Sequence, residues 1–237
     1  MFFRQDYSTP GPGIDPDAPE KTGMARFGEI LQLECVTLVK LNLLFLLTCL
    51  PLVTIPPAVY AMTYVVRRMV LDRVVLCGHH YFTAFRKGFF VSYGGFFAVA
   101  LPLGLSGFGA AFYLERAAES FLFFLPFLFC STVFLVTLLA STYCYGLLTS
   151  GRGLGESLKL GILLGAGRPL RGALAAVFLF GSLVISVLEF PLSAIYLLFI
   201  GFSVPCLIGH FYTRTVLRKY CPEQPEPWEE PDEADKI

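Results

Sequence analysis

Residues 120–151 read SFLFFLPFLFCSTVFLVTLLASTYCYGLLTSG and contain no Asp, Glu, Lys or Arg. A helix that crosses a membrane needs about 20 mainly apolar residues, and this stretch is longer than that. Three further stretches lack the same four residue types, at 88–114, 172–188 and 190–213. An uncharged run at 41–66 precedes them. The sequence therefore predicts an all-α fold, a polytopic transmembrane helical bundle.

The composition supports the same fold class. Mean hydropathy is +0.66, and charged residues make up 15% of the chain, against about 25% in ordinary globular proteins. The long runs show no sustained alternation of polar and apolar residues, which a transmembrane β-barrel would need. Nucleic-acid binding would need a basic patch with aromatic stacking positions, and the bases here are better explained as determinants of topology. We expect a lipid bilayer around the protein and no nucleic-acid partner.

The bases between the apolar runs predict how the helices are oriented. Two loops, 67–88 and 152–171, each carry at least four bases and a single acid, and Arg214, Arg218 and Lys219 come directly after the last apolar run. Cytoplasmic loops of membrane proteins are enriched in Lys and Arg. We therefore expect both basic loops and the C-terminus in the cytoplasm. The short linkers near 115–119 and 189–191 should lie outside.

The run at 41–66 allows two topologies. Three prolines interrupt it: Pro51, Pro56 and Pro57. Read as one span, it gives five crossings with the N-terminus outside. However, proline inside a helix removes a backbone donor and breaks the helix. We favour a hairpin with a first helix at 26–49, a turn at 51–57 and a return helix at 58–71, which gives six membrane helices and two cytoplasmic termini.

The hairpin brings Glu34 and Lys40 into the membrane, where such residues cost about 2.5–3.5 kcal/mol each on insertion scales. Ionisable residues at this depth usually face a bundle interior or a cavity. Both are therefore candidate functional residues. His210, one turn before Arg214 near the cytoplasmic end of the last run, is a further candidate, for proton relay.

Asn42 and Thr54 are the polar residues that the hairpin itself must accommodate. A buried Asn42 needs a partner, and a hydrogen bond to another helix is worth about 0.6–2 kcal/mol in membranes. Thr54, which lies between Pro51 and Pro56, can pair with carbonyls that the helix breaks leave free. We expect Asn42, Thr54 and Pro56 to close the first hairpin against the bundle.

The remaining segments are short. A Pro- and Gly-rich leader at 1–25 lacks the apolar region of a signal peptide, and the acidic, Pro-rich tail at 221–237 is typical of disorder. The single transmembrane domain spans 26–220. Two loops, 74–88 and 153–168, should form short interfacial helices. In the first, Phe82, Phe85 and Phe89 should pack on apolar neighbours, while Arg86 and Lys87 meet anionic headgroups.

No motif indicates a reaction, a metal or a cofactor. The seven cysteines have irregular spacings and predict no disulfide framework. The sequence Cys77-Gly78-His79-His80 offers soft and imidazole ligands, but no second ligand pair follows at zinc-site spacing. The histidines do not combine with a nucleophile into a catalytic pattern. We expect a protein that is not an enzyme and that binds no metal or cofactor.

The first third of the chain resembles the YesL family of bacterial membrane proteins. The resemblance rests on Arg26-Phe-Gly-Glu-Ile, on LNLLFLLTCLPLVTIP at 41–56 and on YFTAFRKGF at 81–89. It covers roughly residues 2–90. Pro57 and the His79-His80 pair depart from the family's usual glycine-proline and acidic residues.

The resemblance implies no activity, because none is established for the family. Its members are often encoded beside sugar-uptake transporters and polysaccharide-degrading enzymes in gram-positive bacteria. It therefore implies an accessory or assembly factor for carbohydrate uptake in the bacterial plasma membrane, with a sugar ABC-transporter permease as the expected partner. Two alternatives stay open. The chain is itself a transporter or channel, with a wet path lined by Glu34, Lys40, Asn42 or His210, or it is a membrane enzyme or sensor.

Overall fold

The computed structural model describes residues 23–71, 73, 75–117, 120–189 and 193–220. These residues form helices joined by turns, and none of them lies in a β-strand. The all-α fold predicted from the sequence is confirmed for this part of the chain. The leader up to residue 22 and the tail at 221–237 lie outside the described residues.

The helices follow one another along the chain with short connections. In order they are α1 (Met24–Leu33), α2 (Cys35–Cys49), η1 (Leu52–Thr54), α3 (Ile55–Val70), α4 (Cys77–Lys87), α5 (Phe89–Ala117), η2 (Phe121–Phe123), α6 (Phe124–Leu148), α7 (Leu154–Gly167), α8 (Pro169–Leu188), α9 (Ala194–Phe199) and α10 (Ser203–Tyr220).

Helix α3 is the centre of the fold. Thirteen of its 16 residues are buried, and it contacts α2, α4, α5, α6 and α10. The main hydrophobic core surrounds it and includes Leu38 and Leu41 of α2, Tyr81 of α4 and Leu207 of α10. A helix that is buried on all sides must be apolar around its circumference. Accordingly, α3 carries charge only near its C-terminus, at Arg67 and Arg68.

The prolines of the first hairpin lie where helices tolerate them. Pro51 precedes the 3₁₀ turn η1, and Pro56 and Pro57 lie in the first turn of α3. Since N–H groups in a first turn have no partner within the helix, proline costs little there. The break predicted between two helices is confirmed. The return helix begins at Ile55, however, so it contains both prolines instead of starting after them at residue 58.

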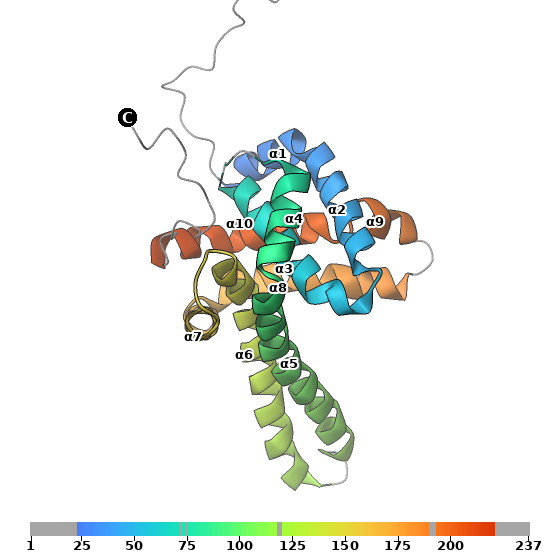
Figure 1. Cartoon of the computed structure of the whole chain (residues 1–237). Coiled ribbons are helices and arrows are strands. Elements are labelled where there is room, and N and C mark those ends of the chain that lie inside the picture. The colour runs from blue at the N-terminus through green and yellow to red at the C-terminus, as the bar shows by residue number, and fades with distance from the viewer. Residues whose placement is uncertain (1–22, 72, 74, 118–119, 190–192, 221–237) are drawn as a thin grey trace, which may run out of the picture.

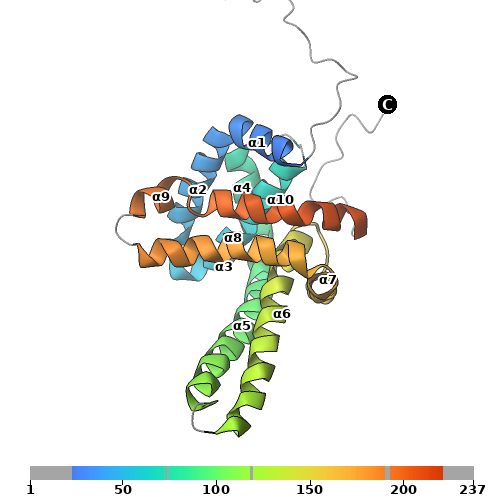
Figure 2. The same ribbon diagram turned by 180° about the vertical axis from the view of Figure 1, so that it is seen from behind.

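Helices α5 and α6 form a long antiparallel hairpin that projects from the rest of the molecule (Figures 1 and 2). Its projecting part exposes many large apolar side chains, among them Leu101, Leu105, Phe108, Phe112, Leu125 and Phe129. Soluble monomers rarely expose a continuous apolar surface of this extent. Such a surface is what lipid or another membrane protein would cover.

Helices α8 and α10 lie side by side and run across the direction of the α5–α6 hairpin in both views (Figures 1 and 2). Phe178 and Tyr212 stack between them with ring centroids 6.1 Å apart. Gly209 allows the close approach, because a Cβ there would lie 2.9 Å from Cδ1 of Leu179. The apolar runs predicted these segments as helices, but a run of apolar residues does not specify the direction of one helix relative to the next.

Three single helices are long and apolar enough to cross a membrane, at Phe89–Ala117, Phe121–Leu148 and Pro169–Ser186. The pair Met24–Leu33 and Cys35–Cys49 passes the same criterion together, so the described residues hold up to four such spans. This agrees with a membrane protein. Helix α3, with 16 residues, is slightly shorter than the usual range of about 17–25.

Two of the predicted membrane segments are not single straight helices. The first, at 26–49, is bent by 70° between α1 and α2, and Glu34 lies at the bend, where its N–H donates to the carbonyl of Ile30 at 2.9 Å. The last apolar run is broken between Phe199 and Ser203 into α9 and α10. The bend means that Glu34 need not lie within a continuous spanning helix.

The helices predicted at 74–88 and 153–168 are present as α4 and α7. That they lie on a membrane surface stays a prediction.

Helix α7 packs closely along α6 through Gly161 and Gly165. A Cβ at either glycine would come within 3.2 Å of the backbone at Ala140.

Gly165→Ala should lower the thermal stability of the purified protein. The added Cβ would lie 3.0 Å from the backbone nitrogen of Ala140, so one helix must shift, and overpacking of this kind costs about 1–3 kcal/mol. Gly155→Ala in the same helix is the control, because a Cβ there meets nothing within 4 Å. Thermal unfolding in detergent should show a lower midpoint for the first variant only. Equal midpoints for the two variants would contradict the packing described.

Candidate functional site

The side chain of Asn42 joins α2 to the junction between α9 and α10. It is completely buried. Its Nδ2 donates to the carbonyls of Leu197 and Leu198, both at 2.8 Å. Its Oδ1 accepts from the N–H groups of Phe202 at 3.0 Å and Ser203 at 3.1 Å. The hydrogen bond to another helix that the sequence predicted for Asn42 is therefore present.

A helix junction explains why an asparagine is suited to this position. The end of α9 leaves carbonyls without partners inside the helix, and the start of α10 leaves N–H groups unpaired. Asn carries both a donor and an acceptor group, so one side chain pairs with both helix ends. Gly201 permits the tight turn between them, since a Cβ there would lie 2.6 Å from Cα of Leu197.

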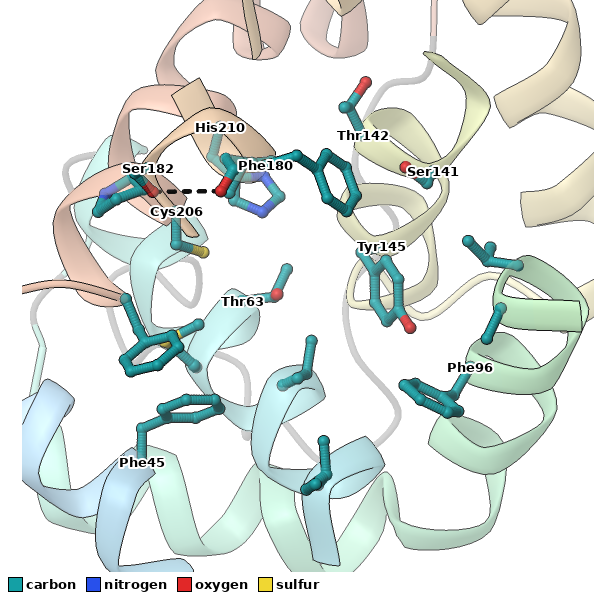
Figure 3. Close-up of a pocket in the computed structure, with 18 of the residues that line it drawn as sticks. Phe45, Thr63, Phe96, Ser141, Thr142, Tyr145, Phe180, Ser182, Cys206 and His210 are labelled. Carbon is teal, nitrogen blue, oxygen red and sulfur yellow. Dashed lines mark hydrogen bonds between the residues drawn. The ribbon is translucent and has the colours of Figure 1, made fainter. Parts of the chain in front are cut away.

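A cavity of about 390 Å³ lies next to this junction, between α2, α3, α5, α6, α8 and α10 (Figure 3). Small-molecule sites usually measure about 300–1,000 Å³. Most of its wall is apolar, including Phe45, Ile55, Val59, Met62, Phe96, Val99, Ala100, Leu103, Leu179, Phe180, Phe202 and Pro205. No Asp, Glu, Lys or Arg is among the described residues that line it.

Most polar side chains of the cavity gather toward one end, while the Tyr145 hydroxyl points toward the other (Figure 3). The polar lining residues are Thr63, Ser141, Thr142, Tyr145, Ser182, Cys206 and His210. In Figure 3, Ser182 and His210 lie on one side of this end and Ser141 and Thr142 on the other, with Phe45 and Phe96 at the opposite end. The cavity is therefore amphiphilic, with an apolar end and a polar end.

Three of the polar hydroxyls are already used by their own helices. Ser141 donates to the carbonyl of Leu138 at 2.7 Å, Thr142 to that of Leu139 at 2.8 Å, and Ser182 to that of Leu179 at 3.2 Å. Among the described residues, none pairs with the Tyr145 hydroxyl or with the ring of His210. These two groups are the strongest hydrogen-bonding groups that the wall offers to a bound molecule.

The position of His210 depends on a glycine in the facing helix. His210 is 7% exposed. A Cβ at Gly146 of α6 would lie 3.4 Å from Cε1 of its ring and 3.1 Å from Cδ1 of Leu217. The absence of a side chain at Gly146 thus makes room for the imidazole.

A buried arginine lies beyond the polar end of the cavity. Arg67 follows the wall residue Thr63 by one turn of α3, and its guanidinium donates to the carbonyl of Thr149, which caps the C-terminus of α6. A cation is favourable at this end of a helix, where the backbone dipole is negative. The polar end therefore has a positive charge behind it.

The other candidates from the sequence lie elsewhere. Glu34 is half-buried at the α1–α2 bend and Lys40 is exposed. Of the four residues expected along a wet path, His210 alone lines the central cavity, and Asn42 supports its wall indirectly. Thr54 donates to the carbonyl of Pro51 at 2.6 Å and to that of Thr48, as the sequence predicted for the helix break.

Helix α4 turns Tyr81 and Ala84 toward the core, where both are fully buried. Phe82 is 48% exposed and contacts Tyr81 with ring centroids 5.7 Å apart, so its packing at a membrane surface stays a prediction. Phe85 does pack on the core. Tyr81 lies 2.6 Å from the hydroxyl of Thr48 in α2, and its burial raises the pKa of the phenol. Arg86 and Lys87 are exposed.

The Cys77–His80 segment is a helix start. The Nδ1 atom of His80 accepts from the N–H of Leu76 at 2.9 Å, at the N-terminus of α4. Among the described residues, no three His, Cys, Asp or Glu side chains lie close enough together to hold a metal ion.

Sequence reasoning missed Thr63, Arg67 and Tyr145 as members of one site. Arg67 was interpreted only as a base that sets topology. One sequence feature does point to this site. Ala-Met-Thr-Tyr at 61–64 and Ala-Ser-Thr-Tyr at 140–143 are similar, and each places hydroxyl groups at the end of an apolar run, just before a basic loop. That similarity does not reveal which helices face one another.

Residues 38–109 match the sequence model of a family described as "Protein of unknown function, DUF624". The matched part contains Asn42, the proline turn and the segments of α3 and α5 that line the cavity. No curated protein and no solved structure matches the chain.

Asn42→Leu should destabilise the folded protein without preventing its insertion. The variant removes four hydrogen bonds and leaves two carbonyls and two N–H groups without their partner. Measured hydrogen bonds in membranes reach about 1.7 kcal/mol and buried unpaired groups cost about 1–3 kcal/mol, so we expect a loss of about 2 kcal/mol. Denaturant unfolding of the detergent-solubilised protein measures this difference.

Thr132→Val is the matched control for that experiment. Thr132 is also a polar residue of an apolar helix, but it is exposed and its hydroxyl donates only to the carbonyl of Leu128 in its own helix, at 2.8 Å. Its replacement should change stability by about 0.5 kcal/mol or less. If Asn42→Leu were as stable as Thr132→Val, the junction would not depend on Asn42.

Proposed function

We propose that this chain is a non-enzymatic integral protein of the bacterial plasma membrane that serves as an accessory or assembly factor for carbohydrate uptake. The match of residues 38–109 to a family without an assigned function leaves the role open. The link to carbohydrate uptake comes from the resemblance of residues 2–90 to the YesL family.

The observation that carries this proposal is the character of the cavity wall. A sugar presents hydroxyl groups all around its ring, so a sugar path needs many donors and acceptors. Here the wall is mainly apolar, and Ser141, Thr142 and Ser182 donate to their own helices. Such an interior favours a protein that supports sugar uptake by contact with another subunit over one that carries the sugar itself.

The projecting α5–α6 hairpin supports the same proposal. Its large apolar side chains, such as Phe108, Phe112 and Phe129, are exposed, and the hairpin extends beyond the body of the protein (Figure 1). In a bilayer this surface is available to lipid or to the helices of a neighbouring permease.

A second candidate function is transport by the chain itself. The cavity favours it, because it lies at the centre of the helices and His210 can accept and donate protons. The cargo would then be a small, mainly apolar molecule, in view of the wall.

We further propose six membrane crossings with both termini in the cytoplasm. The six segments expected from the apolar runs are α1 with α2, α3, α5, α6, α8, and α9 with α10. Because α8 and α10 run across α5 and α6 (Figures 1 and 2), six crossings require these two pairs to take a common direction in the bilayer. The bases of the 67–88 and 152–171 loops support this orientation, and the helix break between α2 and α3 supports a hairpin in place of a single crossing at 41–66.

Cysteine labelling in intact cells tests this topology. In a background without the native cysteines, a membrane-impermeant maleimide should label Val53→Cys, because Val53 is 68% exposed in the turn before α3. The same reagent should miss a cysteine at Thr83 of α4, which should be labelled only after the cells are permeabilised. Labelling of a cysteine in the leader from outside would establish the five-crossing alternative.

Co-purification from native membranes tests the accessory function. After chemical cross-linking in cells grown on an oligosaccharide, an affinity-tagged chain should retain a sugar ABC-transporter permease well above the level retained by a tagged, unrelated membrane protein. Deletion of the chain should lower uptake of that sugar. Sugar uptake by liposomes that contain this chain alone would contradict the accessory role.

A further inference from the structure

The wall of the central cavity indicates what kind of molecule it binds. We infer that it is a binding site for an acyl chain, with the chain at the apolar end and its carbonyl or carboxyl oxygen at the polar end. This inference does not depend on the role in carbohydrate uptake.

The size and the apolar end argue for a hydrocarbon chain. A cavity of about 390 Å³ is large enough for a small molecule. Val59 of α3, Phe96 and Ala100 of α5, and Phe45 of α2 line it. An apolar group that leaves water for such a wall gains about 0.8 kcal/mol per buried CH₂, so a chain is bound without specific contacts along its length.

The polar end argues for an oxygen acceptor at the head of that chain. His210 projects from α10 into the polar end of the cavity, whereas the Tyr145 hydroxyl points away from it, toward Phe96 (Figure 3). An imidazole N–H is a donor, and a carbonyl or carboxylate oxygen accepts from it. The side chain of His210 is buried, so such an acceptor would meet it away from bulk water.

The charges around the polar end select against a cationic head group. Arg67 lies one turn beyond Thr63 and is 8% exposed, and no acid is among the described lining residues. A carboxylate or a neutral carbonyl is compatible with a positive charge nearby, whereas an ammonium group is repelled.

The chemistry is shared by a free fatty acid and by one chain of a membrane lipid. Both place an acyl chain next to a carbonyl group.

The junction that Asn42 holds forms one wall of the cavity through Gly201 and Phe202. The shape of the site therefore depends on the same hydrogen bonds that hold α9 and α10.

Photolabelling of the full chain in phosphatidylglycerol nanodiscs tests the site. A diazirine analogue of decanoic acid is bound and irradiated, and the labelled residues are mapped by mass spectrometry. Label should concentrate on cavity residues such as Val59, Phe96 and Ala100. Decanoic acid should compete for this label, while decylamine at the same concentration should not.

Two substitutions in adjacent residues of α5 give a matched pair. Ala100→Phe fills the cavity and should lower cavity labelling about tenfold or more, equivalent to about 1.4 kcal/mol of affinity or more. Leu101→Phe is the control, because Leu101 is 57% exposed on the outside of the helix and is not among the lining residues. Should Ala100→Phe unfold, Val59→Phe fills the cavity from α3 and repeats the test.

The head group is tested separately. His210→Leu should keep the labelled position but remove the preference for decanoic acid over decylamine. Mass spectrometry of co-purified molecules then shows whether the bound acyl chain belongs to a phospholipid or to a free fatty acid. A phospholipid that co-purifies with the natural protein but not with Ala100→Phe indicates a bilayer lipid. Cavity labelling without such a phospholipid indicates a free fatty acid. Label confined to outward-facing residues, or equal cavity labelling in Ala100→Phe and Leu101→Phe, would overturn the inference.

Discussion

The four hydrogen bonds of Asn42 are the interaction on which the arrangement of the C-terminal helices depends. A break in a helix that lies inside a membrane leaves backbone groups unpaired, at several kcal/mol for each group. Asn42 pairs with two carbonyls before the break and two N–H groups after it. These hydrogen bonds allow the chain to break between α9 and α10, so that α10 runs in a different direction from α9. The break also brings Gly201 and Phe202 into the cavity wall.

The same constraint connects the two ends of the chain. Asn42 belongs to the N-terminal hairpin, whose turn is closed by Thr54 and whose return helix α3 forms the core. Its partners lie at Leu197–Ser203. Because α3 also contacts α5, α6 and α10, the proline turn, the central helix and the α9–α10 junction together enclose one cavity. The polar end of that cavity is bounded by His210, with Arg67 beyond it.

The sequence predicted the helices and one of their polar contacts, but not their arrangement. Uncharged apolar runs identify helices because a membrane requires them, and Asn42 predicted a partner because a buried amide needs one. The bend at Glu34 and the break at Gly201 were not predicted, since apolar periodicity continues through both. The cavity was not predicted either. Its wall comes from helices far apart in the chain, and the residue types in it, such as Tyr145 and Thr63, are ordinary in membrane helices.

Amide hydrogen exchange at the α9–α10 junction tests the central claim most directly. Exchange at the N–H groups of Phe202 and Ser203, which donate to Asn42, is compared between the natural protein and Asn42→Leu, with amides in the middle of α6 as the internal reference. We expect both junction amides to be protected in the natural protein and to exchange much faster in the variant, while the reference amides keep their rates. Fast exchange at Phe202 and Ser203 in the natural protein, or unchanged protection in Asn42→Leu, would contradict the account.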